Sequence, residues 1–134
     1  MTNKTSQGLN HYRSVGAYSA AASENRVELV LQLMDGACDQ ITMARGHMDR
    51  KEAAQKGEAI RRATGMIDGL RASLDHEQGG EIAGNLDRLY DYMNRRLVEA
   101  NVNNAPELLT EVSGLLGEIR SAWRQITTAA TEPA

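Results

Sequence analysis

The chain has 134 residues, a formal charge of −3 and 41% apolar residues, which is ordinary for one globular domain. Aromatic residues make up only 4% and phenylalanine is absent, so the core has to be aliphatic, which suits packed helices. The sequence has no basic stripe that could neutralise phosphates, and we therefore expect no binding to nucleic acid.

The number of cysteines and the hydropathy of the chain indicate the cellular compartment of the protein. The single cysteine, Cys38, cannot form an internal disulfide and lies in an apolar helical pattern, which indicates a small buried residue in a reducing compartment. No apolar run approaches the roughly 20 residues that span a bilayer. Residues 1–8 lack the apolar stretch of a secretory signal. We therefore expect a cytoplasmic protein without membrane insertion.

Residues 1–22 are predicted to form a short N-terminal arm or helical cap that is partly flexible. Its apolar residues recur every three positions among Gly, Ser, Asn and Ala, and a helix of that composition is marginal on its own. One interpretation is a disordered tail. The presence of two tyrosines favours the other, an arm that docks its apolar residues on a surface. These residues are Leu9, Tyr12, Val15 and Tyr18.

The first long helix is predicted from the N-cap Ser23 to about His47, with Glu24 in the first turn complementing the helix dipole. Its main apolar stripe consists of Val27, Leu31, Met34, Cys38, Ile41 and Met48. A second apolar row consists of Leu29, Leu33 and Ala37. The apolar face is therefore wider than a single packing seam requires.

The second helix is predicted over residues 52–76. Two glycines inside it, Gly65 and Gly69, lie four residues apart and so share one face, where another helix or a ligand backbone could come close. The pair Gly79-Gly80 is predicted to end the helix. The expected buried stripe consists of Ile60, Thr64, Ile67, Leu70 or Arg71, and Leu74.

The third helix is predicted over residues 81–101, with the apolar stripe Leu86, Leu89, Tyr90, Met93, Leu97 and Ala100. Asn104 is predicted to cap the fourth helix, with Pro106 in its first turn and Glu107 completing a capping box. The stripe of this helix consists of Leu108, Val112, Leu115, Ile119, Trp123 and Ile126.

Four amphipathic helices joined by short connections predict an all-α fold, an antiparallel up-down four-helix bundle with the N-terminal arm or cap attached. The bundle is expected over residues 23–127, and residues 128–134 are expected to form a frayed tail. No segment shows strand alternation bounded by hairpin turns.

Residue patterns of known catalytic and metal sites are missing from the sequence. Di-metal bundles need Glu-x-x-His on two helices, and no Glu here has a His three residues later. A histidine phosphotransfer relay needs an exposed mid-helix histidine, whereas His47 and His76 fall near predicted helix ends, with His76 expected beside a favourable C-terminal dipole. We therefore predict no catalytic residue, no metal and no cofactor.

The most distinctive stretch of the third helix is Leu89-Tyr90-Asp91-Tyr92-Met93-Asn94-Arg95-Arg96-Leu97-Val98-Glu99-Ala100-Asn101. It resembles the pattern Leu-Tyr-Asp-Tyr-Met-x-Arg-Arg-Leu-x-x-Ala-Asn of the flagellin export chaperones, the FliS family. Further similar stretches are Leu33-Met34-Asp35-Gly36-Ala37, residues 74–83 with Asn85-Leu86, and Glu111-Val112-x-x-Leu115-Leu116 followed by Ala122-Trp123. The resemblance extends from about Tyr12 to Ile126. One departure is Asn25-Arg26, where the family usually has Ser-Pro.

The resemblance implies a non-enzymatic helical bundle that binds the disordered C-terminal segment of newly made flagellin in the cytoplasm. Holding that segment would block premature polymerisation and keep flagellin competent for the flagellar type III export apparatus. The export gate and other flagellar regulators are implied as further partners. In the family, the N-terminal arm is thought to cover part of the binding surface when flagellin is absent.

Partner-binding candidates come from three parts of the chain: Leu9, Tyr12 and Val15 in the arm, Leu33 and Met34 in the first helix, and Tyr90, Met93, Arg96, Leu97 and Asn101 in the third. Core packing is the alternative for each apolar candidate. Within the third helix, we expect Met93 to face inward with Leu86 and Leu89, and Arg96 and Asn101 to face the client. The alternative functions are a self-associating helical bundle adaptor without affinity for flagellin and, less favoured by the positions of its histidines, a histidine phosphotransfer relay.

Overall fold

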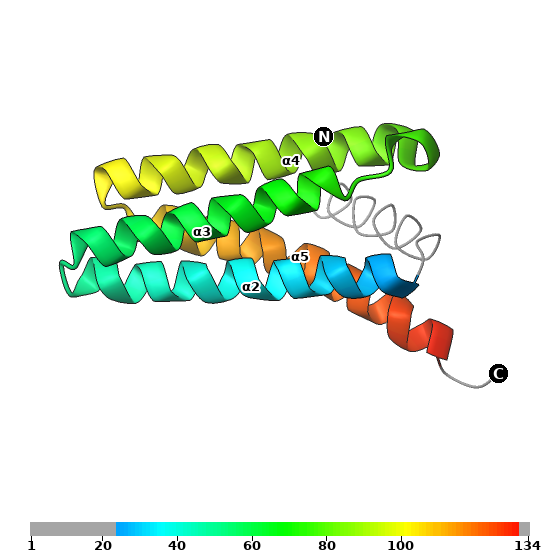
Figure 1. The fold of residues 1–134 in the computed structure, drawn as a ribbon, viewed down its shortest axis with the longest axis horizontal. Helices are drawn as coiled ribbons and strands as arrows, with labels where there is room; N and C mark the ends of the chain where they lie inside the picture. Colours follow the sequence, from blue (N-terminus) through cyan, green and yellow to red (C-terminus); the bar gives the residue numbers. More distant parts are fainter. Residues whose placement is uncertain (1–23, 132–134) are drawn as a thin grey trace, which may run out of the picture.

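The structure is a computed structural model that describes the backbone of residues 24–131 and the side chains of residues 25–124. It contains the helices α2 (Glu24–Asp49), α3 (Ala53–Ala72), α4 (His76–Asn103) and α5 (Pro106–Thr131). Each helix runs opposite to the one before it, and no strand occurs in the described range (Figure 1). The predicted all-α up-down four-helix bundle is confirmed.

The helices enclose a single aliphatic core. Helix α2 packs against α3 and α5, and α4 packs against the same two helices. The inward faces repeat every three or four residues, as amphipathic helices require. Tyr90 and Trp123 are the aromatic residues of this core within the described side chains. Its other large members with almost no exposed surface are Met34, Ile67, Leu70, Met93, Leu97, Leu109, Val112 and Leu116.

The connection between α3 and α4 differs from the sequence prediction. Helix α3 ends at Ala72 instead of continuing to residue 76. Asp75 then acts as the N-cap of α4, because its carboxylate accepts a hydrogen bond from the Gln78 N–H at 3.0 Å. His76 is therefore the first residue of α4, and the prediction that it lies at a helix C-terminus is wrong. Helix α3 has its C-cap at Ser73, so it ends before Asp75 begins the next helix and well before the glycine pair.

The glycine pair lies inside α4. Gly80 has φ +50° and ψ −120°, which separates the first turn of α4 from the rest of the helix. An L side chain rarely adopts that conformation, whereas glycine does so without a Cβ clash. The glycines therefore interrupt a helix instead of ending one, and the long straight part of α4 begins after Gly80, where the third helix was predicted.

We expect Gly80→Ala to lower the free energy of unfolding by about 1 kcal/mol, because alanine would be forced into a positive-φ conformation. Gly114→Ala on α5 is the matched control, since a Cβ there meets no atom within 4 Å and no positive φ is required. The control should be neutral or stabilising. Urea titrations of both variants measure the difference, and an equal gain in both would contradict the assigned backbone conformation.

Asn104 ends α4, whereas it was predicted to cap the following helix. It has φ 49° and ψ 52°, and its N–H bonds to the Ala100 carbonyl. Asparagine tolerates this left-handed conformation better than most residues do, so it serves as a C-cap. Pro106 and Glu107 lie in the first turn of α5, as predicted.

Polar side chains bridge the seams between neighbouring helices at the rim of the core. Asp35 of α2 accepts a hydrogen bond from Arg120 of α5 at 2.6 Å. Arg71 of α3 donates to Asp87 of α4 at 2.9 Å. Such half-exposed pairs contribute little free energy.

The Arg71–Asp87 pair makes stability depend on pH. The hydrogen bond from Arg71 lowers the pKa of the Asp87 carboxyl. The pair therefore contributes its full stabilisation above the ordinary carboxyl pKa of about 3.9 and loses it as the pH falls through the lower folded-state value. We expect Asp87→Asn to cost no more than about 1 kcal/mol at pH 7. That cost should shrink below about pH 4, as followed by urea titration, and a difference that grows on acidification would contradict the assignment.

Candidate functional site

Four of the predicted partner contacts lie in the core. Met34, Met93 and Leu97 have 0% of their surface exposed, and Tyr90 has 2%. Their side chains face the other helices, so in this structure they pack in the core, which was the alternative to a contact with a partner. The inward orientation expected for Met93 agrees with its burial. Leu9, Tyr12 and Val15 lie outside the described residues.

Arg96, one of the surface candidates, joins α4 to α5. Its Nε lies 3.0 Å from the Tyr92 hydroxyl and 3.1 Å from a Glu111 carboxylate oxygen, and its Nη1 lies 3.0 Å from Glu99. The Tyr92 hydroxyl in turn donates to Glu111 at 2.7 Å. These hydrogen bonds, led by the one with Tyr92, raise the pKa of the Arg96 guanidinium. Arg96 therefore has a structural role, whatever it contributes to a partner.

Asn101, another surface candidate, lies at the end of the α3–α4 seam. Its backbone carbonyl accepts a hydrogen bond from Lys56 Nζ at 2.9 Å. Its side-chain amide lies 3.9 Å from the position that a Cβ on Gly57 would take. Asn101 is half-exposed, and its immediate surroundings are polar.

Among the described residues, an apolar surface lies between α2 and α3 and extends over several turns of α2. We call it the α2–α3 strip. Its apolar side chains are Leu29, Leu33 and Met43 of α2 with Met66 of α3, and Gly36, Gln40, Gly65 and Gly69 lie between them. Leu29 and Met43 are 48% and 45% exposed, which is unusual for large apolar side chains. Leu33, a predicted contact, is half-buried in its middle. Leu29 and Leu33 of the second apolar row predicted from the sequence lie on this surface, whereas Ala37 of that row is fully buried in the core. Met43 and Met66 were not among the predicted contacts.

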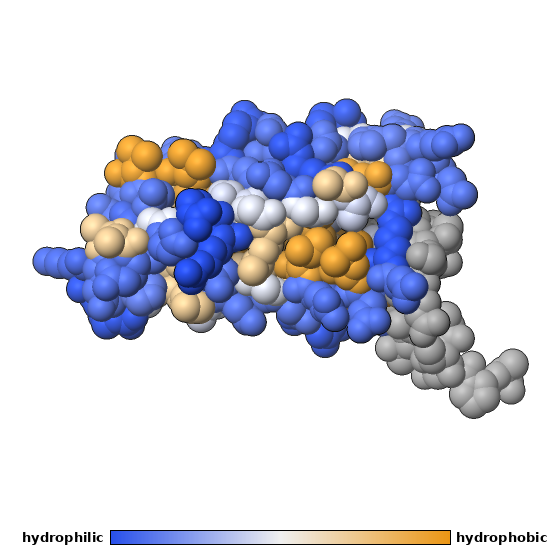
Figure 2. Space-filling model, in the orientation of Figure 1, coloured by the Kyte–Doolittle hydropathy of each residue, from blue (hydrophilic) through white to orange (hydrophobic). Residues whose placement is uncertain are grey.

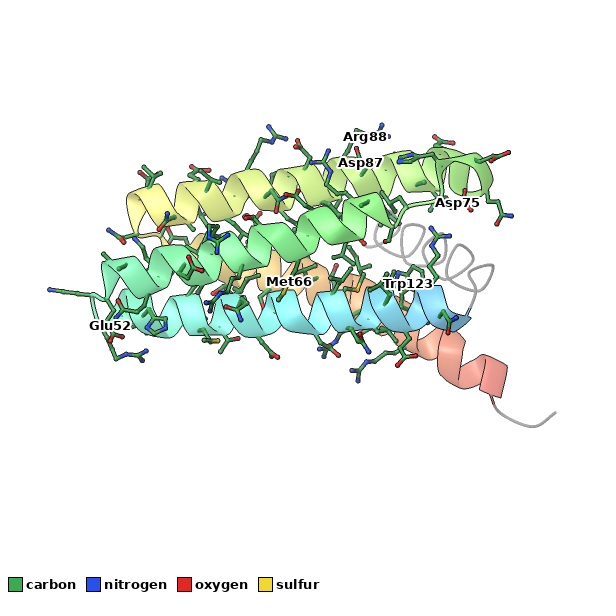
Figure 3. All side chains as sticks on the ribbon, in the orientation of Figure 1. Glu52, Met66, Asp75, Asp87, Arg88 and Trp123 are labelled. Atoms are coloured by element: carbon green, nitrogen blue, oxygen red, sulfur yellow. The ribbon has the colours of Figure 1, made fainter. Side chains whose placement is uncertain are left out.

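Glycines allow α2 and α3 to approach closely under this strip. A Cβ at Gly36 would lie only 2.8 Å from the Met66 sulfur, and one at Gly69 would lie 3.3 Å from Leu33 Cδ1. Figure 2 shows apolar atoms gathered over α2, and Figure 3 places Met66 between α2 and α3. Gly65 adds an open position, since a Cβ there would meet nothing within 4 Å.

A smaller apolar patch lies on the C-terminal half of α4. Val98 and Val102 are 56% and 73% exposed and lie four residues apart, so they share one face of the helix. Apolar atoms are visible at this end of the molecule in Figure 2. Two valines alone are a modest surface, because single exposed apolar residues are common on soluble proteins.

The histidine His47 and the cysteine Cys38 lie in surroundings that do not favour a catalytic role. His47 Nδ1 lies 3.0 Å from a Glu52 carboxylate oxygen, and this hydrogen bond is the main cause that lowers the pKa of Glu52. Burial raises the pKa of the Cys38 thiol, which disfavours the nucleophilic thiolate. No group of three potential metal ligands occurs among the described residues. The described helices also include none long and apolar enough to cross a membrane.

Comparison with known proteins decides the family. The family model described as "Flagellar protein FliS" matches residues 8–130. The chain belongs to the FliS family. The flagellar secretion chaperone FliSB of Pseudomonas aeruginosa is 46% identical to it over 121 residues, which cover 90% of this chain and 96% of that relative. The FliS chaperone of Salmonella typhimurium is 44% identical over 95% of both chains.

More distant FliS relatives share the same name. The flagellar secretion chaperone FliS of Vibrio cholerae is 36% identical and covers 88% of this chain and 87% of its own. FliS is a family of chaperones, not of enzymes, which agrees with the catalytic motifs missing from the sequence. The resemblance inferred from the Leu89–Asn101 stretch is therefore confirmed.

Proposed function

We propose that this protein is a cytoplasmic secretion chaperone for flagellin. It binds the disordered C-terminal segment of the subunit, prevents premature polymerisation and keeps the subunit competent for flagellar type III export. The observation that carries the proposal is the near full-length similarity to proteins named flagellar secretion chaperones, at up to 46% identity among those compared. We also propose the export gate and other flagellar regulators as further partners.

The accessible apolar surface of the bundle supports this function physically. A disordered client loses chain entropy when it becomes ordered, so it has to bury a large apolar area in return. Leu29, Leu33 and Met43 on α2, with Met66 on α3, offer such area outside the core. Of the earlier candidates, Leu33, Arg96 and Asn101 are accessible to a client. Leu9, Tyr12 and Val15 of the arm stay proposed contacts.

Isothermal titration calorimetry with a synthetic flagellin C-terminal peptide tests the proposal. We expect one-to-one binding with a dissociation constant of about 1 μM or below, and a binding enthalpy that becomes more negative as temperature rises. Flagellin truncated before that segment is the control and should release no heat. The absence of binding at micromolar concentrations, combined with a tight dimer in sedimentation, would support the self-associating bundle instead.

A further inference from the structure

The described methionines differ widely in how far solvent reaches their side chains. Met34 and Met93 have 0% of their surface exposed, whereas Met43 is 45% exposed. Met48 and Met66 are half-buried and pack against the outside of the core. A thioether has to meet an oxidant in order to react with it, so Met43, Met48 and Met66 are the described methionines that are open to oxidation.

Met66 stands out among these three because its side chain fills a gap in the neighbouring helix. The end of the side chain lies in the space that Gly36 of α2 leaves by having no side chain. A Cβ on Gly36 would lie only 2.8 Å from Met66 Sδ and 3.2 Å from Met66 Cε. The sulfur therefore lies directly against the backbone of α2, as the position of Met66 between α2 and α3 in Figure 3 illustrates.

A second glycine contact lies beside the first. Leu33 of α2 lies against Gly69 of α3, where a Cβ would be 3.3 Å from Leu33 Cδ1. Leu33 and Gly36 are three residues apart on α2, and Met66 and Gly69 are three residues apart on α3, so each pair shares one face of its helix. Each helix thus supplies one large side chain and one glycine. The close approach of α2 and α3 depends on both contacts, and Met66 fills one of them.

We propose that Met66 is an oxidation site, at which reaction with a hydroperoxide loosens the contact between α2 and α3. With hydrogen peroxide, the Met66 sulfur attacks one oxygen, and an S–O bond forms as the O–O bond breaks. The other oxygen leaves as hydroxide and takes the proton of the transferred oxygen, which gives water. The sulfur loses two electrons and the peroxide gains them. The product is a sulfoxide, which is polar and carries one oxygen more than the thioether.

The space at Gly36 is too small for this product. A single carbon atom added on Gly36 would already crowd the Met66 sulfur, so an oxygen on the sulfur either pushes α2 away or moves the end of the side chain into solvent. Both outcomes remove the apolar packing of Met66 against α2. The same reaction at Met43 removes little packing, because that side chain already lies about half in solvent.

Peroxide treatment of the full-length protein tests the site, with Met66→Leu and Met43→Leu as matched variants. Leucine keeps an apolar side chain of similar volume and has no sulfur. We expect hydrogen peroxide to lower the urea midpoint of the wild-type protein and of Met43→Leu by about 0.5 M or more, and to leave that of Met66→Leu nearly unchanged. Each protein is compared with itself before treatment. Effects of oxidised Cys38 or Met48 are common to all three proteins, and peptide mass spectrometry identifies the oxidised residues.

A third variant tests the structural reason without an oxidant. Met66→Gln places a polar end of similar length against Gly36 and should have a lower urea midpoint than Met66→Leu. Equal midpoints of these two variants would overturn the loss of packing. An equal peroxide-induced shift in the wild-type protein and Met66→Leu would overturn the assignment to Met66. So would a Met66 that stays unoxidised when Met43 is fully converted. None of these results depends on the proposed flagellin client.

Discussion

Replacing Leu97 by alanine is expected to lower the free energy of unfolding by about 3 kcal/mol. The Leu97 side chain is completely buried in the core, and truncation removes its transfer free energy and leaves a cavity that neighbouring helices cannot fully close. The buried residues of α4 all lie on one face, so no contact elsewhere on the helix compensates for the lost packing of Leu97. Urea or thermal unfolding followed by circular dichroism measures the effect.

The adjacent residue provides the control. Val98 is 56% exposed, so Val98→Ala removes little buried surface and improves helix propensity. Its effect should stay within about 0.5 kcal/mol of zero. Equal losses for Leu97→Ala and Val98→Ala would contradict the orientation of α4 in this structure.

The same variant separates core from contact at Leu97, which was also a candidate partner contact. If Leu97 acts only in the core, folded Leu97→Ala protein should bind the flagellin peptide with wild-type affinity at a temperature well below its unfolding transition. A large loss of affinity in fully folded protein would show that the residue reaches the client, which requires α4 to rearrange on binding.

Replacing Lys56 by methionine is expected to cost about 2 kcal/mol, the second largest effect. Lys56 is the buried charged residue among the described side chains, with 7% of its surface exposed. Its Nζ donates to the Asn101 carbonyl at 2.9 Å and to the Asn104 side-chain oxygen at 2.5 Å. Hydrogen bonds from a charged donor contribute more than neutral ones, and methionine keeps the apolar stem while both acceptors lose their partner.

Asn104→Gly provides a double-mutant cycle for this contact. Glycine keeps the left-handed backbone of the α4 C-cap and removes only the side-chain acceptor. The cost of Lys56→Met with Asn104→Gly should be smaller than the two single costs added together, by about 1 kcal/mol. Strict additivity in urea titrations would show that the two side chains do not interact in solution. Arg61→Ala, at a largely exposed position on the same helix, should be nearly silent.

These stability effects bear on the chaperone function. A bundle that leaves apolar surface exposed for a client depends on its core alone for stability. Partial unfolding would expose still more apolar surface and promote aggregation. The half-exposed polar pairs at the seams, such as Asp35–Arg120 and Arg71–Asp87, add little to this stability, so the packed core supplies most of it. Binding of the proposed flagellin client would stabilise the folded protein by mass action, by an amount that rises with the logarithm of the peptide concentration above the dissociation constant.

The sequence by itself determined the helical class, the number of long helices and most of the core. Apolar residues three and four apart leave a helix with one face to bury, and four such faces of similar length can bury one another only as a bundle. The same residues, read as the Leu89–Asn101 stretch, identified the family. These features follow from local periodicity and residue identity, which do not depend on neighbouring helices.

Only the tertiary structure decided which apolar residues remain accessible. Met34 and Leu33 are adjacent in the sequence, and both were predicted contacts, yet the first is fully buried and the second is half-exposed. The difference depends on where α3 crosses α2, which the close approach at Gly36 and Gly69 sets. The roles of Asp75 and Asn104 were likewise open, because a capping residue between two helices can serve either one until the turn between them is formed.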